Sequence, residues 1–371
     1  MPKPDFVLEA IKLLSKSYMG SPYRSSDQTT PVNNFVETTR KKLAEFLNII
    51  KSENLAFTFN ATHGLNIIIK SILKHGGHVV LSCFEHNAVL RPIHHMMNNG
   101  YDISFSVINP DSNGVFSSDT IISAIRPDTE LIVWNHASNV TGHISPVALI
   151  AKIGKDKKIL TLLDCSQTVG ILPIDTFKLD VDFIAGTCHK GLLSLPGLGF
   201  VYMRNPDLVD SLLQGGGGFN SKDLRHPSAS PLKFEAGTPN YFAMMALNNS
   251  LEYLHRNREQ CLQQFTNCNE ALVMQLQAIE EVSLYEAEGS NKLPITSFNV
   301  EGITPTQLAL ILYREYGIIT RAGIHCAPFI HQVLGTYPMG CVRVSIGHAN
   351  TVQDGYTLAS AIKKIVRKIT K

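Results

Sequence analysis

The sequence lacks long runs of charge of one sign. Its 371 residues include 33 lysines and arginines against 31 aspartates and glutamates, which gives a formal net charge of +2. This balance provides no electrostatic footprint for nucleic acid or for an anionic membrane surface. No uncharged apolar run approaches the roughly 20 residues that a membrane-spanning helix requires. We therefore expect neither nucleic acid nor a membrane as a partner.

Further absences bear on compartment and metal content. The opening segment "MPKPDFVLEAIKLLSK" carries Asp5 and Glu9 where a secretion signal would need an unbroken apolar stretch. The seven cysteines are odd in number and include no CxxC pair, so we expect neither a disulfide framework nor a zinc site. His94 and His95 are adjacent, but no partner spacing supports a metal. These features predict reduced thiols and a cytoplasmic location.

Apolar segments that end in polar residues recur through the first two thirds of the chain. Residues 55–73 and 78–97 each resemble a strand followed by a helix, and residues 130–142, 158–170 and 182–191 contain further apolar strands. Strands separated by helices predict an α/β fold with a mainly parallel sheet sandwiched by helices. The polar residues follow the carboxyl ends of the strands, where open α/β sheets bind ligands.

The pattern changes beyond about residue 245. A long helical stretch comes first, and a second helix follows with Pro305 at its start and Gly317 just past its end. Two short strands and a closing helix complete the chain. We predict a large α/β domain over residues 1–245 and a smaller C-terminal α+β domain over residues 246–371.

Several predicted strands end in residues whose side chains could take part in catalysis or ligand binding. The turn "GTCHKG" places Lys190 between two apolar strands, although lysines ordinarily extend into solvent. Asp164 ends another strand, and His86 lies in "EHNAV" after a third. Ala61 and Thr62 occupy the first turn of a helix, where free N–H groups and the helix dipole favour an anion. Taken singly, each has a plainer interpretation as a cap, a turn residue or a structural histidine.

One cofactor requires all of these groups together. Pyridoxal 5'-phosphate needs a lysine for a Schiff base, an acid against its pyridine nitrogen, a flat ring over its own ring and an anion cradle. Lys190 would supply the amine, Asp164 the acid and His86 the stacking ring. Thr62 and Thr187 could hold the phosphate. The sequence therefore predicts a pyridoxal phosphate site.

Seven short motifs follow one another over residues 60–328: "NATHGLN", "EHNAV", "ASNVTG", "LLDCSQTVG", "GTCHKG", "FEAGTPN" and "RAGIHCAP". In these motifs the sequence resembles the cysteine desulfurase family, in the class V aminotransferase group of fold-type I pyridoxal phosphate enzymes. No single motif is decisive, but seven in family order are highly specific. The resemblance implies the fold-type I transferase fold and covers nearly the whole chain.

The same resemblance assigns further cofactor contacts. Asn139 would contact the phenolic oxygen of the cofactor, with Gln167 assisting, and His189 would lie near the phosphate. Thr238 in "FEAGTPN" would reach the phosphate of the neighbouring subunit. The resemblance thus implies a homodimer with composite active sites.

Cys326 matches the persulfide-forming cysteine of the family, on a short loop of the compact-loop subgroup. Most free cysteines are buried small hydrophobes, but a glycine-containing loop favours an accessible thiol. His325 or a nearby base could favour its ionised form. By resemblance, Arg343 is a bidentate clamp for the substrate carboxylate, chemistry that suits a planar guanidinium. Arg321 is a weaker candidate for the same region.

The resemblance implies a cysteine desulfurase that converts L-cysteine to L-alanine. Lys190 would remove the α-proton, and Cys326 would attack the substrate sulfur and become a persulfide. The sulfur would then pass to an acceptor protein that the sequence does not identify.

Three alternatives stay open. A selenocysteine lyase, or a lyase of another thio-amino acid, would use nearly the same residues. Family members usually carry a short strand before a "PKPD"-like segment, and its lack before "MPKPDF" favours a noncatalytic pyridoxal phosphate-binding partner of a sulfur-transfer complex. A dinucleotide-binding dehydrogenase is disfavoured, because "QGGGGFN" (214–220) is not in a strand–GxGxxG–helix setting.

Overall fold

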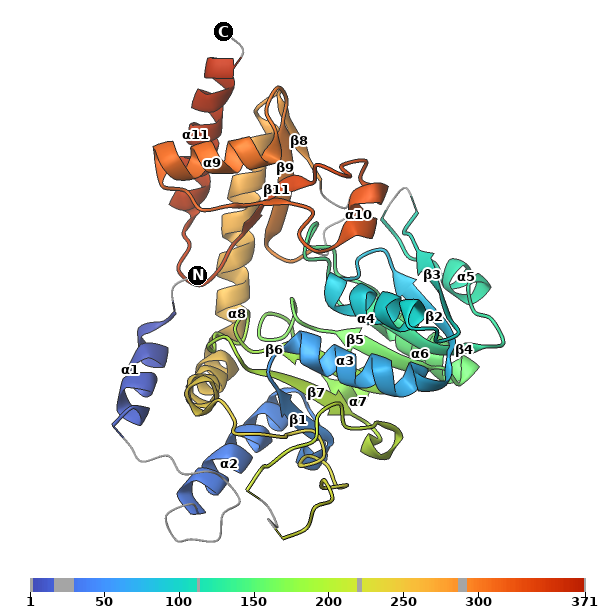
Figure 1. The fold of residues 1–371 in the computed structure, drawn as a ribbon. Coiled ribbons are helices and arrows are strands. Elements are labelled where there is room, and N and C mark those ends of the chain that lie inside the picture. The colour runs from blue at the N-terminus through green and yellow to red at the C-terminus, as the bar shows by residue number, and fades with distance from the viewer. Residues whose placement is uncertain (1–2, 17–29, 112–113, 219–221, 286–291, 370–371) are drawn as a thin grey trace.

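The architecture consists of a large and a small β-sheet, with one long helix packed against both (Figure 1). The structure is a computed structural model and describes residues 3–16, 30–111, 114–218, 222–285 and 292–369. The large sheet has the strand order β1-β7-β6-β5-β4-β2-β3. Its strands are β1 (Leu55–Thr58), β2 (Gly77–Ser82), β3 (Ile103–Ile108), β4 (Thr129–Asn135), β5 (Leu160–Asp164), β6 (Phe183–Thr187) and β7 (Gly199–Met203).

The directions of the strands bring six carboxyl ends to one edge. Strands β3, β2, β4, β5 and β6 are mutually parallel. Strand β7 runs antiparallel to both β6 and β1, so β1 points the same way as β6. The predicted mainly parallel sheet is confirmed, and the residues that follow β1, β2, β4, β5 and β6 emerge on the same side.

Helices cover both faces of the large sheet. Val79 and Leu81 of β2 pack with α3 and α4, whereas Val80 packs with α2, α6 and the start of α8. This alternation follows from the strand geometry, and burial on both faces explains the continuous apolar strands. The helices of the first part of the chain are α1 (Asp5–Leu14), α2 (Thr30–Phe46), α3 (Ala61–Ile72), α4 (Asn87–Asn98), α5 (Ser118–Ser123), α6 (Val147–Lys157) and α7 (Thr176–Leu179).

The small sheet is antiparallel, with the strand order β10-β11-β9-β8. The predicted helix after residue 304 is present as α9. It begins at Pro305 after a Thr304 cap, and it ends at Gly317 in the left-handed region with φ of 67°. The elements are α8 (Tyr241–Gln277), β8 (Val282–Leu284), β9 (Ile295–Val300), α9 (Pro305–Tyr316), β10 (Arg321–Gly323), α10 (Pro328–Val333), β11 (Cys341–Ser345) and α11 (Val352–Ile369).

The long helix α8 belongs to both parts of the molecule. Ala243 and Leu254 pack into the core beneath the large sheet, and Leu272 and Leu276 pack into the core of the small sheet. The predicted domain division after residue 245 falls inside this helix and stays a prediction, because α8 contributes to both cores.

No helix within the described ranges is long and apolar enough to cross a membrane. The same part of the chain contains no group of three or more His, Cys, Asp or Glu side chains placed to hold a metal ion. His94 instead packs edge-on against Phe105, with ring centroids 5.3 Å apart.

Candidate active site at the edge of the large sheet

Lys190 lies on the turn after β6, and close backbone contact fixes that turn. Gly170 has a φ of +86°, and a Cβ on it would lie 2.3 Å from the carbonyl carbon of Gly191. A Cβ on Gly191 would lie 2.4 Å from the carbonyl oxygen of Val169. Because both residues are glycine, the two loops can touch, and the backbone beside Lys190 is held in place.

The side chain of Lys190 lines a cavity of about 160 Å³ at the carboxyl ends of the strands. Asp164 at the end of β5 is 4% exposed and accepts a hydrogen bond from the Ser166 backbone N–H at 2.9 Å. Burial lowers the pKa of Lys190, and the Asp164 carboxylate opposes that shift. The cavity is lined by Asn60, Ala61, Thr62, His86, Ala88, Asn135, Asn139, Asp164, Ser166, Gln167, Thr187, His189 and Lys190.

One wall of the cavity is suited to an anion. Helix α3 begins at Ala61, and the Asn60 side chain caps it by accepting from the His63 backbone N–H at 2.9 Å. The first turn of a helix carries N–H groups that the helix itself leaves free. Thr187 Oγ1 lies 2.7 Å from His189 Nδ1 and lines the same cavity. These groups together could cradle a phosphate.

His86 is fixed as the cap of α4. Its Nδ1 accepts a hydrogen bond from the Ala88 backbone N–H at 3.0 Å, which assigns the ring proton to Nε2. Burial lowers the pKa of His86, although Asp164 nearby acts in the opposite direction. The imidazole is therefore neutral near pH 7, as suits a ring that stacks on another ring.

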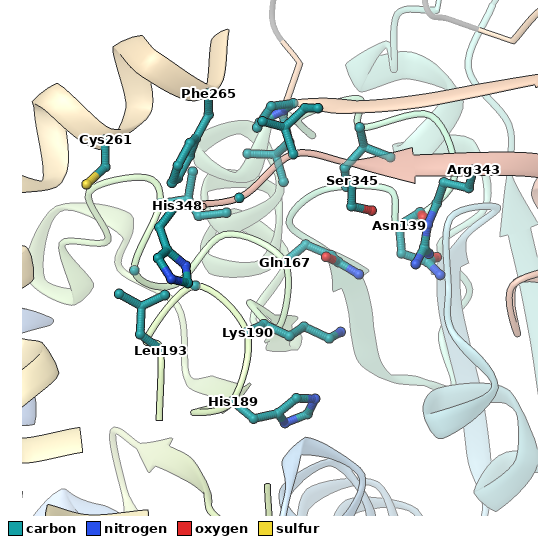
Figure 2. Close-up of a pocket in the computed structure, with 18 of the residues that line it drawn as sticks. Asn139, Gln167, His189, Lys190, Leu193, Cys261, Phe265, Arg343, Ser345 and His348 are labelled. Atoms are coloured by element: carbon teal, nitrogen blue, oxygen red, sulfur yellow. The ribbon is translucent and has the colours of Figure 1, made fainter. Parts of the chain in front are cut away.

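A second cavity of about 300 Å³ adjoins the first and shares Lys190, His86, Asn139, Gln167 and His189 with it. Figure 2 shows Lys190, Gln167, Asn139 and Arg343 converging on this space.

Two arginines from the small sheet form part of this second cavity. Arg343 on β11 is the register partner of Arg321 on β10. Arg343 Nη1 donates to the Asn139 carbonyl oxygen at 2.8 Å. Burial and the charge of Arg321 lower the pKa of Arg343. Two guanidinium groups side by side favour a carboxylate ligand.

Cys326 lies on the loop between β10 and α10. Of the seven cysteines, six are buried and Cys326 is partly exposed. His325 and Cys326 have φ of 47° and 60°, and consecutive non-glycine residues in this region store strain of a kind that clusters at functional sites. The Asn87 N–H donates to the Cys326 carbonyl oxygen at 2.7 Å, and Asn139 Nδ2 donates to the His325 carbonyl oxygen at 2.8 Å. The loop is thus tied to the start of α4 and to the segment after β4.

Arg321 is a charged neighbour of the Cys326 thiol, and its Nη2 lies 3.8 Å from the sulfur. His325 does not assist the thiol, so that expectation is wrong. Its Nε2 lies 3.0 Å from the Cys341 carbonyl oxygen, and burial is the main factor that lowers its pKa to about 3. The imidazole is held neutral against the sheet.

Comparison with known proteins gives the family of the chain. The model of the class-V aminotransferases matches residues 1–355. The chain belongs to this family. A probable cysteine desulfurase of Methanothermobacter thermautotrophicus is 30% identical over 337 residues, which covers 89% of this chain and 83% of that relative. The cysteine desulfurase IscS of Dictyoglomus turgidum is 27% identical, with 98% and 91% covered.

Solved structures agree. The apo structure of a cysteine desulfurase from Thermococcus onnurineus NA1 superposes with a TM-score of 0.91 at 26% identity, covering 99% of this chain and 93% of that one. The predicted resemblance to the cysteine desulfurases is therefore confirmed, and with it the pyridoxal phosphate dependence of the family. These relatives favour a desulfurase over the alternatives of a lyase, a noncatalytic partner or a dehydrogenase.

The residues of this class-V chain fit the cofactor. Asn139 Oδ1, Ser166 Oγ and Arg343 Nε are buried and have no hydrogen-bond partner within the described residues. Leaving such a group unpaired costs about 1–3 kcal/mol, so these atoms suit polar ligand groups. A carboxylate, an amine, a neutral imidazole and a helix start border the same space, which matches the functional groups of pyridoxal phosphate.

One predicted residue lies apart from the others. Thr238 is exposed on the loop before α8 and borders a separate hollow beside Phe57 and Asn240. It does not line the cavity of Lys190 in its own chain. Its predicted role toward a neighbouring subunit is therefore still a prediction.

Glu85 is a residue of this site region that the sequence did not single out. It is fully buried, and its Oε1 accepts from Ser82 Oγ at 2.5 Å and from the Asn135 N–H at 2.7 Å. Burial, with Asp164 nearby, raises the pKa of Glu85 to about 8. A carboxylate directly before His86 at the end of an apolar strand was the available signal.

Proposed function

We propose that this chain converts L-cysteine to L-alanine and holds the released sulfur on Cys326. The observation that carries the proposal is that one residue, Arg321, connects the Cys326 thiol with the cavity of the Lys190 amine. Arg321 lies 3.8 Å from the Cys326 sulfur and lines the same cavity as Lys190. A substrate held there would have its sulfur and its α-carbon within the reach of different side chains.

The cofactor would be held by the groups that line the smaller cavity. Bound pyridoxal phosphate supplies an electron sink that stabilises negative charge at the substrate α-carbon. Asp164 would keep its pyridine nitrogen protonated, and His86 would cover its ring. Asn139 and Gln167 would contact its phenolic oxygen. The phosphate would be held by Ala61, Thr62, Thr187 and His189.

Lys190 is proposed as the base that takes the α-proton. Burial lowers its pKa, so a larger fraction of the amine is neutral near pH 7 than in a solvated lysine. A base closer in pKa to the working pH transfers protons more efficiently. The fixed backbone of the turn limits where the amine can reach.

Arg343, with Arg321, is proposed to bind the substrate carboxylate. The Cys326 thiolate then attacks the substrate sulfur. The bond between that sulfur and the substrate β-carbon breaks, and the β-carbon takes up a proton to become the methyl group of alanine. Cys326 carries the sulfur as a persulfide until an acceptor protein removes it.

The assignment of Lys190 and Cys326 can be tested on purified protein. Borohydride reduction should fix the mass of the cofactor on the peptide that contains Lys190. Cys326→Ala should keep the yellow colour of the bound cofactor and lose sulfide production from L-cysteine. Cys341→Ala, a buried thiol away from the loop, is the matched control. Undiminished desulfuration by Cys326→Ala would remove this residue from the mechanism.

A homodimer with composite sites is the second part of the proposal. Exposed Thr238 lies outside the cavity of its own chain, as a residue that serves a partner subunit must. Thr238→Ala should weaken cofactor retention on dialysis, and light scattering should give a dimer. An active monomer would refute the composite site. We expect the enzyme to act in the cytoplasm.

A further inference from the structure

Cys326 borders a hollow that does not include Lys190 but shares Thr62, His86 and Ala88 with the smaller cavity. This hollow, of about 360 Å³, lies between α3, α4 and the Cys326 loop. Asn66 and Lys70 of α3 and Arg91 and His95 of α4 line it, and we call it the α3–α4 groove. Figure 1 shows α10, which follows the Cys326 loop, on the side of the molecule where α3 and α4 lie. The thiol therefore lies between the cofactor site and an outer surface.

The walls of the α3–α4 groove are free of exposed carboxylates. Residues 61–98 contain one acidic residue, Glu85, which is fully buried. Residues 317–353, which include the Cys326 loop, contain none. Lys70 and Arg91 have no ion-pair partner in the described part of the chain, whereas Lys74, one turn further along α3, is paired with Asp210. The groove beside the thiol is thus positively charged.

The positive charge of the α3–α4 groove selects which partners can approach the sulfur of Cys326. The loop is held by the hydrogen bonds from Asn87 and Asn139, so Cys326 meets a partner at a fixed place. An approaching group crosses the field of Lys70, Arg91 and Arg321. Clefts lined by one sign of charge raise the encounter rate of oppositely charged partners and disfavour like-charged ones.

We propose that the α3–α4 groove is the docking site for a segment of the acceptor protein in which carboxylates flank the accepting thiol. The proposal rests on the proposed function, since it assumes that Cys326 carries the sulfur. The acceptor thiolate attacks the outer sulfur of the persulfide. The bond between the two sulfurs breaks, Cys326 leaves as a thiolate, and the acceptor becomes the persulfide. No external oxidant or reductant is needed.

Thiol–disulfide exchange tests the groove without cofactor chemistry. Three blocked peptides carry a central cysteine flanked on each side by two glutamates, two glutamines or two lysines, and each is activated as a mixed disulfide with thionitrobenzoate. The Cys326 thiolate attacks the peptide sulfur and releases thionitrobenzoate, which is followed by absorbance. The other six cysteines are buried, and Cys326→Ser gives the background rate.

The glutamate peptide should react roughly tenfold faster than the glutamine peptide at low salt, and the lysine peptide should be the slowest. The three rates should converge at ~0.5 M salt, where charges are screened beyond a few ångströms. Equal rates at low salt would overturn the proposal. Glutathione activated in the same way represents a small anionic thiol, and a rate equal to that of the glutamate peptide would overturn docking of a protein segment.

Charge-reversal variants locate the effect. The double variant Lys70→Glu/Arg91→Glu should lose the preference for the glutamate peptide. The matched control Lys152→Glu/Lys157→Glu makes the same change in net charge on exposed positions of α6, which covers the opposite face of the large sheet. That control should keep the preference. An unchanged preference in the groove variant, or its loss in the control, would contradict the location.

The exchange assay separates this inference from the proposed function. It needs neither pyridoxal phosphate nor L-cysteine. If L-cysteine loads Cys326 with sulfur but the exchange shows no charge preference, the groove proposal fails alone. If L-cysteine never loads Cys326, the proposed function fails, and the transfer step proposed for the groove fails with it.

Discussion

Replacing Glu85 with glutamine should change how the stability of the protein depends on pH. Glu85 is fully buried beside the site, where its Oε1 accepts hydrogen bonds from Ser82 and from the Asn135 backbone. Its Oε2 has no partner within the described residues. Burial is the largest cause that raises its pKa to about 8. Glutamine keeps the shape and the accepting oxygen of the protonated acid without the titration.

The sign and size of the effect follow from linkage. The ordinary pKa of 4.5 applies in the unfolded chain and about 8 applies in the folded one. The stabilisation from the bound proton is fully present below the unfolded value and is lost as the pH rises through the folded value. Between the two, the folded state holds one proton that the unfolded state releases, which corresponds to about 1.4 kcal/mol per pH unit.

Urea unfolding at a series of pH values measures this difference. The single tryptophan, Trp134, is fully buried next to Asn135 and reports on this part of the sheet by its fluorescence. From pH 5.5 to 7.5, the unfolding free energy of the wild type should fall by about 3 kcal/mol relative to that of Glu85→Gln. A difference between the two proteins that stays constant over this range would refute a protonated Glu85.

Two further predictions concern the turn and the substrate clamp. Gly170→Ala should lower the unfolding free energy by about 2 kcal/mol or more beyond Gly100→Ala, measured by urea unfolding. Both glycines have positive φ (+86° and +85°), but a Cβ meets the Gly191 backbone in the first and nothing within 4 Å in the second; equal losses would contradict the contact. Arg343→Lys should raise the KM for L-cysteine by roughly tenfold or more, and Arg321→Lys by less, because partly buried Arg343 is the better-fixed bidentate donor. A larger effect at Arg321 would reverse the assignment.

The main elements and several site residues could be predicted because they depend on local pattern. In the sequence, apolar strands are followed by polar residues. Where the strands are parallel, these polar residues meet at one edge of the sheet. Asp164, His86 and Lys190 accordingly line one cavity. The strand order was beyond such reasoning, because the reversal of β7 and its pairing with β1 depend on contacts distant in sequence.

The environment of each side chain was harder to predict than its position. The sequence does not single out Glu85, and only its complete burial between β2 and β4 shows why its pKa rises. The sequence predicts that His325 or a nearby base assists Cys326, yet the fold turns the His325 ring toward the Cys341 carbonyl. The α3–α4 groove has the same origin, because α3, α4 and the Cys326 loop meet only in the folded chain.

The proposed mechanism requires that sulfur from L-cysteine arrives on Cys326. The most direct measurement incubates the protein, loaded with pyridoxal phosphate, with a limiting amount of L-cysteine labelled with a heavy sulfur isotope and without reductant. The products are then analysed by peptide mass spectrometry and alanine quantification. If Cys326 receives the sulfur, its peptide should gain one heavy sulfur atom, and an equal amount of alanine should form. Alanine formed with no label on that peptide, or no alanine at all, would contradict the proposed mechanism.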